Sequence, residues 1–148
     1  MLKINVINNV NEIPGGLNRD KIVDFLFVHL DQFGDTKSAI NKCLDYAFSD
    51  EKGEGGFVLT AHVDDQLVGA LIMNFSGMSE YIPENVLVYI AVHRDYRGKG
   101  YGREIIEKAF ELCDGDVKLH VEYDNPAKRL YERIGFVNKY AEMRYKNS

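Results

Sequence analysis

Cysteine, positive charge and long apolar runs are all scarce in this sequence of 148 residues. Only Cys43 and Cys113 are present, each inside a helical pattern, which favours two free thiols in a reducing compartment over a disulfide framework. The formal net charge of −5 gives no overall attraction to nucleic acid or an anionic membrane, and mildly favours cationic partners. No run reaches the roughly 18 apolar residues of a membrane span, and the N-terminus lacks the apolar core of a signal peptide. We therefore expect a cytoplasmic protein without nucleic-acid or membrane partners.

Histidine is also sparse and lacks the spacing of a metal site. No two of His29, His62, His93 and His120 lie one helical turn apart, so we expect no metal. No linker, internal repeat or low-complexity tract divides the chain. We therefore expect residues 1–148 to form a single domain, long enough to bury a core without disulfides or metal.

What is present is a succession of strand and helix patterns that predicts a mixed α/β sheet. The expected strands are 2–8, 57–63, 66–75, 86–93, 117–123 and 136–145. The expected helices are 18–33, a second one capped by Asp35 or Thr36 with its apolar stripe at 40–48, then 100–113 and 125–135. Asp64 and Asp65 are expected to join two of the strands into an antiparallel hairpin. The strand at 86–93 is apolar at nearly every position, which predicts burial on both faces.

The stretch RDYRGKGYGREIIEKAF, Arg94 to Phe110, places glycine at every second position between that buried strand and a helix. The free N–H groups of a helix's first turn converge where the helix dipole is positive, and glycine lets an anion approach them closely. The glycines are Gly98, Gly100 and Gly102, and the cations beside them are Arg97, Lys99 and Arg103. The pattern predicts a site for a phosphate group.

The spacing excludes two common nucleotide sites. A P-loop needs a glycine five places before Gly98 and a serine or threonine after the lysine, and the sequence has neither. The dinucleotide fingerprint that Gly98 and Gly100 would begin needs a third glycine where Arg103 stands.

The loop has arginine, two residues, glycine, one residue and glycine in order, at Arg97, Gly100 and Gly102. This spacing resembles the acetyl-CoA pyrophosphate loop of the GNAT superfamily of N-acetyltransferases. Downstream, NPAKRLYERIGF, Asn125 to Phe136, is similar to the closing segment of that family, and LVGALIM upstream is similar to its hairpin strand. The resemblance covers about residues 57–136 and implies a single-domain, mixed and mostly antiparallel central sheet flanked by helices. A tight strand-to-helix turn alone accounts for one glycine, but not for three with flanking cations.

The resemblance implies where acetyl-CoA, the expected cosubstrate, binds. Main-chain groups of Ile90, Ala91 and Val92 would pair with the pantetheine arm as an extra strand does. Amides of the loop would hold the pyrophosphate, and the residues of this loop are Arg97, Gly98, Lys99, Gly100, Tyr101, Gly102 and Arg103. Asn125 would bind pantetheine or orient the last helix, and a plain N-cap role explains it equally well. Lys128 and Arg129 would meet the 3′-phosphate or form a solvated helix face.

The resemblance makes Tyr131 the candidate catalytic residue. A neutral amine attacks the thioester, the sulfur leaves as a thiolate, and a positioned phenol donates a proton to it. The alternative is a core residue beside Leu130 and Ile134. An amine with a pKa of about 10.4 must first lose a proton. The candidates for the base are Glu84, Glu122, His93, Tyr89 and water.

The acceptor is expected to be a small-molecule or peptide amine held by segments 18–48, 76–85 and 137–145. Charge suggests a cationic amine, and the residues that suggest it are Asp31, Asp35, Glu80 and Glu84, with Tyr81 and Phe75 for its apolar part. Two alternatives stay open: a sensor or interaction module that binds acyl-CoA without turnover, and transfer of a longer acyl group. A homodimer paired through the final strand is also possible on sequence grounds.

Overall fold

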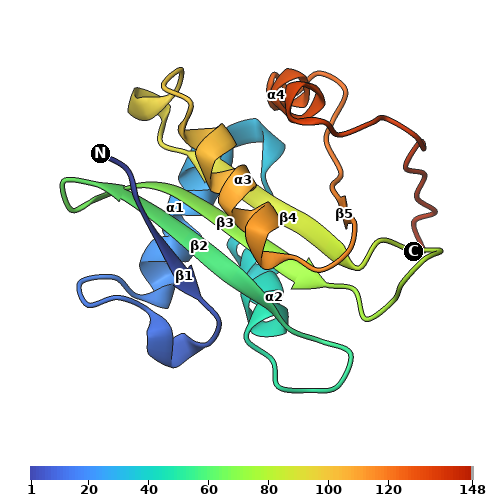
Figure 1. The fold of residues 1–148 in the computed structure, drawn as a ribbon, viewed down its shortest axis with the longest axis horizontal. Helices are drawn as coiled ribbons and strands as arrows, with labels where there is room; N and C mark the ends of the chain where they lie inside the picture. Colours follow the sequence, from blue (N-terminus) through green and yellow to red (C-terminus); the bar gives the residue numbers. More distant parts are fainter. Residues whose placement is uncertain (148) are drawn as a thin grey trace.

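The protein, described for residues 1–147 by a computed structural model, is built on one five-stranded sheet (Figure 1). The strands are β1 (Lys3–Ile7), β2 (Gly56–Val63), β3 (Gln66–Phe75), β4 (Asn85–Val92) and β5 (Val117–Lys118). They lie in the order β1-β2-β3-β4-β5, and the first four are antiparallel while β5 is parallel to β4. The expected mixed, mostly antiparallel sheet is confirmed.

Helices cover both faces of the sheet. They are α1 (Arg19–Leu30), α2 (Lys37–Ala47), α3 (Tyr101–Leu112) and α4 (Ala127–Ile134), with short 3-10 turns at Val10–Glu12, Asp31–Phe33 and Arg94–Tyr96. Helices α1 and α2 pack on one face, and α3 lies across the other (Figure 1). None of the helices in the described residues combines the length and apolarity needed to cross a membrane.

The helix starts follow the side chains that the sequence offers for capping. The N–H of Lys21 donates to the Asn18 side chain at 2.9 Å, and the N–H of Ala39 donates to the Thr36 hydroxyl at 3.1 Å. Thr36, and not Asp35, therefore caps α2. Helix α1 ends at Leu30, earlier than expected, because Asp31 takes a positive φ of 56° and a 3-10 turn follows.

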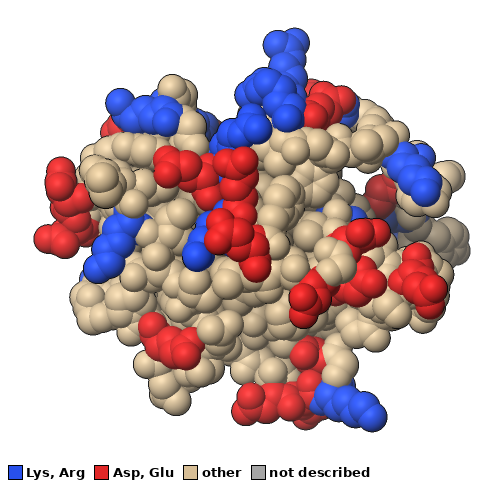
Figure 2. All heavy atoms as spheres, viewed as in Figure 1, with Lys and Arg blue, Asp and Glu red and all other residues tan. Residues whose placement is uncertain are grey.

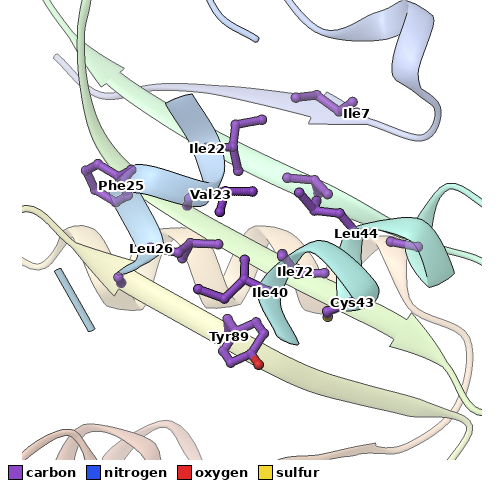
Figure 3. Packing of buried hydrophobic residues seen from close by; sticks show 14 residues of the cluster. Ile7, Ile22, Val23, Phe25, Leu26, Ile40, Cys43, Leu44, Ile72 and Tyr89 are labelled. Carbon is purple, nitrogen blue, oxygen red and sulfur yellow. The ribbon is translucent and has the colours of Figure 1, made fainter. Parts of the chain in front are cut away.

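Two hydrophobic clusters, one on each face of the sheet, form the core. The cluster under α1 and α2 includes the fully buried Ile22, Leu26, Ile40 and Leu44 (Figure 3). The cluster under α3 and α4 includes Phe57, Leu59, Leu71, Ile105 and Ile106. The hairpin between β2 and β3 turns at Asp64 and Asp65, with φ values of 47° and 68°, which is the type I′ geometry expected for a two-residue hairpin.

Strand β4 carries a β-bulge that changes which face its residues occupy. Ile72 of β3 pairs with Tyr89 and Met73 pairs with Leu87, so Val88 is the extra residue. Leu87 belongs to the α3 cluster, whereas Val88 and Tyr89 both belong to the α1 and α2 cluster. Beyond the bulge the normal alternation resumes. Both faces of β4 are packed, as expected, although alternate residues stay partly exposed.

Two expected strands do not form as predicted. The strand at 117–123 shortens to Val117–Lys118, and the strand at 136–145 is absent from the described residues, where that segment is irregular. A strand is stabilised by the ladder it makes with a neighbour, and β5 pairs only with Asn85 and Val86 before β4 reaches its bulge. The apolar alternation of these segments therefore has no neighbouring strand to pair with in this structure.

Candidate acetyl-CoA site

The C-terminal part of β4 has one open edge, which pairs with no described strand. Since β5 pairs only with Asn85 and Val86, no described strand lies beside the last six residues of β4 on that side. The N–H of His93 donates to the Val68 carbonyl at 2.8 Å, so strand alternation turns the main chain of Ala91 toward β3 and that of Ile90 and Val92 toward the open edge. Ile90 and Val92, rather than Ala91, are therefore the residues that can pair with an extended ligand.

The glycine loop follows directly, and its three glycines serve two purposes. Gly98 and Gly100 have φ values of 79° and 83°, and a Cβ on either would meet no protein heavy atom within 4 Å. A Cβ on Gly102 would lie 3.2 Å from Leu130 Cδ2 and 3.7 Å from Val92 Cγ2. The first two glycines therefore leave an open backbone at the N-terminus of α3, and the third permits close packing of α3 against α4.

The cations of the loop differ in what they contact. The Arg97 Nε donates to the Val92 carbonyl at 3.0 Å and its Nη2 donates to the His29 carbonyl at 2.7 Å. The guanidinium of Arg97 therefore holds the loop to α1, with two of its N–H groups engaged by main-chain carbonyls. Lys99 is fully exposed, while Arg103 forms an ion pair with Glu107 at 3.5 Å. Tyr101 is half-buried against the α3 cluster.

On the face shown in Figure 2, lysines and arginines gather along the upper margin, over the loop before α3 and over α4, while the acidic residues lie mostly below. The positive charge therefore lies on the elements that the sequence predicts for the phosphates of CoA, although the net charge of the chain is −5. Lys128 contributes less than its charge suggests, because its Nζ lies 3.2 Å from the Glu132 carboxylate.

Tyr131 lies in α4 with its side chain in the cluster that also contains Ile90 and Val92. It is 9% exposed, and its ring meets that of Phe136 edge-on at 5.9 Å between centroids. Burial raises the pKa of the Tyr131 phenol to about 12, so the hydroxyl keeps its proton at neutral pH. A buried, protonated phenol in the cluster that also contains side chains of β4 can donate a hydrogen bond to a ligand that reaches it.

Asn125 makes the contact expected of a cap. Its Oδ1 accepts a hydrogen bond from the N–H of Ala127 at 2.9 Å, and its carbonyl accepts from the N–H of Lys128 at 3.0 Å. The helix ends at Gly135, whose φ of 126° terminates it as the sequence predicts. This contact accounts for Asn125 without a ligand, so a role in pantetheine binding is an addition that the structure does not require.

The candidate bases lie in different surroundings. Glu84 Oε1 accepts from the N–H of Asp116 at 2.8 Å, and hydrogen bonds from the backbone lower the pKa of the carboxyl, so Glu84 holds the turn before β5. Glu122 is exposed in an irregular segment. The Nδ1 of His93 accepts from the N–H of Asp95 at 3.1 Å. Tyr89 donates to Asp35 at 2.6 Å on the face of α1 and α2. None of these contacts makes one of the candidates the base.

The pairing of Asp35 with Tyr89 is the feature that sequence reasoning missed. The two residues are 54 positions apart. The sequence indicates Asp35 as one of several acidic residues and Tyr89 as part of a strand, but no pattern in the sequence links the two residues. The bulge at Val88 brings the two residues together. An unbroken alternation from Leu87 would put Tyr89 on the α3 face, away from Asp35.

Both thiols are protonated at neutral pH. Burial raises the pKa of Cys43 to about 12 and that of Cys113 to about 11. Neither is a ready nucleophile for an acyl-enzyme intermediate. Within the described residues there is no group of three or more histidine, cysteine and acidic side chains placed to hold a metal ion.

A pair of histidines lies where α1 meets the start of the loop. The rings of His29 and His93 are 4.2 Å apart between centroids, and the Nδ1 of His29 accepts from the N–H of Arg94 at 3.3 Å. Burial, His93, Arg94 and Arg97 lower the pKa of His29 below its ordinary value of 6.5. A neutral imidazole is thus part of the contact that positions the loop.

We expect acid to destabilise the protein through His29. The unfolded chain takes up a proton at this site near pH 6.5 and the folded chain only at lower pH, so stability falls as the pH drops below about 6.5. In thermal unfolding at pH 7 and pH 5, His29→Gln should show a smaller loss of Tm than the unmodified protein. An equal loss in both proteins would contradict this role.

Comparisons with known proteins identify the family of the chain. The family model described as an acetyltransferase (GNAT) domain matches residues 54–138, more than half of the chain. The chain is also 31% identical over 90 residues to human N-alpha-acetyltransferase 30, covering 57% of this chain and 25% of the relative. It is 40% identical over 53 residues to the uncharacterized N-acetyltransferase C550.08 of Schizosaccharomyces pombe, covering 34% of this chain and 22% of the relative. The chain spans about a quarter of the length of these curated relatives.

Solved structures show the same fold over nearly the whole chain. A possible acetyltransferase from Clostridium difficile 630 aligns with a TM-score of 0.67 and 20% identity, covering 99% of this chain and 97% of that one. A ribosomal-protein-alanine N-acetyltransferase from Brucella melitensis biovar Abortus 2308 aligns at 0.66 and 19%, covering 99% of both chains. An aminoglycoside acetyltransferase from an uncultured soil metagenomic sample aligns at 0.64 and 15%, covering 99% and 95%. At these identities the likeness concerns the fold alone.

Proposed function

Because this chain belongs to the GNAT family of acetyltransferases, we propose that it transfers the acetyl group of acetyl-CoA to a primary amine by direct attack in a ternary complex. The observation that carries the proposal is the continuity of two binding features. The open edge of β4 at Ile90 and Val92 is followed, after the 3-10 turn at Arg94–Tyr96, by the open backbone at Gly98 and Gly100. An extended arm that ends in a pyrophosphate fits both.

Residues of this chain are assigned to two parts of acetyl-CoA, the pantetheine arm and the pyrophosphate. The main chain of Ile90 and the N–H of Val92, whose carbonyl already accepts from Arg97, pair with the pantetheine arm, and the amides from Arg97 to Arg103 bind the pyrophosphate. The bare backbone at Gly98 and Gly100 is the structural test of this fit, because a side chain there would stand where the phosphate must approach. Lys99 adds positive charge from solvent.

The chemistry then needs one nucleophile and one hydrogen-bond donor. The neutral amine attacks the thioester carbonyl, the new C–N bond forms, and the C–S bond breaks as the amine loses a proton to a base or water. Tyr131 donates a hydrogen bond to the sulfur as negative charge develops on it. The buried phenol is a donor across the working pH range because its pKa is raised to about 12. The protonated state of both cysteines favours this direct route over an acyl-cysteine intermediate.

The acceptor class follows less directly. The names of the relatives include both an N-alpha-acetyltransferase and an aminoglycoside acetyltransferase, so amines at peptide N-termini and on small molecules both belong in the first screen. A single domain over residues 1–148 and a cytoplasmic location stay predictions. Transfer of a longer acyl group would need no change in the loop or at Tyr131.

The proposal is tested by thermal unfolding with and without acetyl-CoA, together with thiol release over a panel of primary amines. A ligand that binds only the folded state raises Tm. At a concentration of 100 times Kd it increases the free energy of unfolding by about 2.7 kcal/mol. We expect stabilisation by acetyl-CoA and amine-dependent release of CoA. Stabilisation without release on any amine would favour a sensor, and no stabilisation at saturating acetyl-CoA would contradict the proposed site.

A further inference from the structure

We propose that the carboxylate of Asp35, held by Tyr89, binds a second positive charge on the acceptor, so that the substrate is a primary amine carrying another cationic group. This inference rests on the proposed acetyl transfer. It concerns the face of β4 opposite α3, where Tyr89 packs with α1 and α2.

The first step is the position of the pair. Tyr89 lies on β4 next to Ile90, whose main chain faces the open edge, and its side chain extends toward α2. Figure 3 shows the ring beside Ile40 with the hydroxyl pointing away from the aliphatic side chains. The hydroxyl donates to Asp35 Oδ2 at 2.6 Å. The carboxylate thus lies about one tyrosine side chain away from the main chain of β4.

The second step is the state of the two groups. Tyr89 is 8% exposed, and burial and the hydrogen bond to Asp35 raise the pKa of its phenol, so it stays a donor and fixes one carboxylate oxygen. Asp35 itself is exposed, and no lysine or arginine of the described residues lies within ion-pair distance of it. A fixed carboxylate with its other oxygen open to solvent can receive a cation from outside the chain.

The third step decides which amine of the acceptor Asp35 binds. A nearby negative charge favours the protonated form of an amine and raises its pKa. A carboxylate that paired with the reacting nitrogen without accepting its proton would therefore hold it as ammonium and oppose the attack. Because Asp35 is displaced from β4 by the length of the tyrosine, it suits a second cationic group and leaves the reacting nitrogen free to lose its proton.

The charges around the pair predict a competitor. Arg144, in the irregular segment that follows α4, is close enough for its charge to interact with that of Asp35, and Glu142 binds the same guanidinium. Lys37 is engaged by Asp24 at 2.9 Å. Removing the charge of Arg144 should therefore strengthen binding of a cationic acceptor, whereas removing the charge of Asp35 should weaken it.

The experiment compares matched acceptors that differ only in the second charge. Diaminopentane is compared with pentylamine, and alanyl-lysine amide with alanyl-norleucine amide, by KM and kcat in the thiol-release assay. We expect the charged member of at least one pair to have a KM lower by about tenfold, which corresponds to about 1.4 kcal/mol. The pair with the larger difference tells whether the acceptor is a small amine or a basic peptide.

The variants then assign the effect. Asp35→Asn and Tyr89→Phe should each raise the ratio of KM for the charged acceptor to KM for its uncharged partner, because the pair binds the second charge. Arg144→Gln should lower KM for the charged acceptor. Asp50→Asn removes the same charge from an exposed position beyond the far end of α2 and serves as the matched control. Equal KM values within both pairs, or the same discrimination in Asp35→Asn as in the unmodified protein, would overturn the inference.

A binding measurement separates this inference from the proposed function. Thermal unfolding in the presence of CoA reports whether diaminopentane stabilises the protein more than pentylamine does, without any turnover. Stabilisation that is lost in Asp35→Asn supports the second-charge site even when no probe is acetylated. Stabilisation by acetyl-CoA with no preference for the diamine overturns only the inference, and a failure to bind acetyl-CoA overturns both.

Discussion

Replacement of Tyr131 by phenylalanine should lower kcat by about a hundredfold or more and leave the Kd for acetyl-CoA within about twofold. The proposed role of the phenol is to stabilise the negative charge on sulfur, and this charge develops only as the C–S bond breaks. Its loss should therefore appear in the chemical step and not in cosubstrate binding. Single-turnover kinetics and a titration with acetyl-CoA measure the two quantities separately.

Stability distinguishes this role from that of a core residue. The ring of Tyr131 is retained in phenylalanine, and we find no described hydrogen-bond partner for its hydroxyl, so Tm should change little. Tyr46→Phe is the matched control, because its hydroxyl donates to the Phe75 carbonyl at 2.6 Å. That variant should lose about 1 kcal/mol of stability and keep its kcat. A Tyr131→Phe protein with normal kcat would show that the phenol is only part of the core.

The double variant Gly98→Ala with Gly100→Ala should weaken acetyl-CoA binding by about tenfold or more with a loss of about 2–4 kcal/mol of stability. Both residues have φ near 80°, where a Cβ costs about 1–2 kcal/mol per residue. A loop that relaxes to negative φ turns its amides away from the pyrophosphate, and a loop that does not relax presents two methyl groups to it. Isothermal titration with acetyl-CoA measures the loss.

A second double variant separates strain from binding. Gly16 and Gly53 have φ values of 85° and 88°, and a Cβ on either meets no heavy atom within 4 Å, as at the loop. Alanine at both should therefore cost similar stability and leave the affinity for acetyl-CoA intact. Equal affinities in the two double variants would mean that the bare backbone of the loop does not serve the ligand.

Local signals in the sequence were sufficient for most of the fold. The cap at Thr36, the helix end at Gly135, the hairpin turn at Asp64 and Asp65, and the glycine loop each depend on a few adjacent residues, and the structure has them where they were expected. These features are set by backbone conformation and by short-range hydrogen bonds, both of which depend on residues that are close together in the sequence.

Features that depend on distant partners were predicted poorly. The apolar alternation at 117–123 is typical of a strand, but a ladder needs a neighbour, and β4 offers one only at Asn85 and Val86. Glu84 looked available as a base because its tie to the N–H of Asp116 spans 32 positions. The guanidinium of Arg97 looked available to a phosphate because its carbonyl partner on His29 lies 68 positions away.

The bulge at Val88 has a consequence for how β4 tolerates changes in length. Loss of this one residue would restore a regular ladder between β3 and β4 and would leave Leu87 on the α3 face and Tyr89 on the α2 face, beside Asp35. Insertions or deletions in the loop before β4 change only the length of a surface connection. A deletion at Val88 would therefore keep what the two sides of the sheet present, whereas regular pairing that retained Val88 would put Tyr89 on the α3 face, away from Asp35.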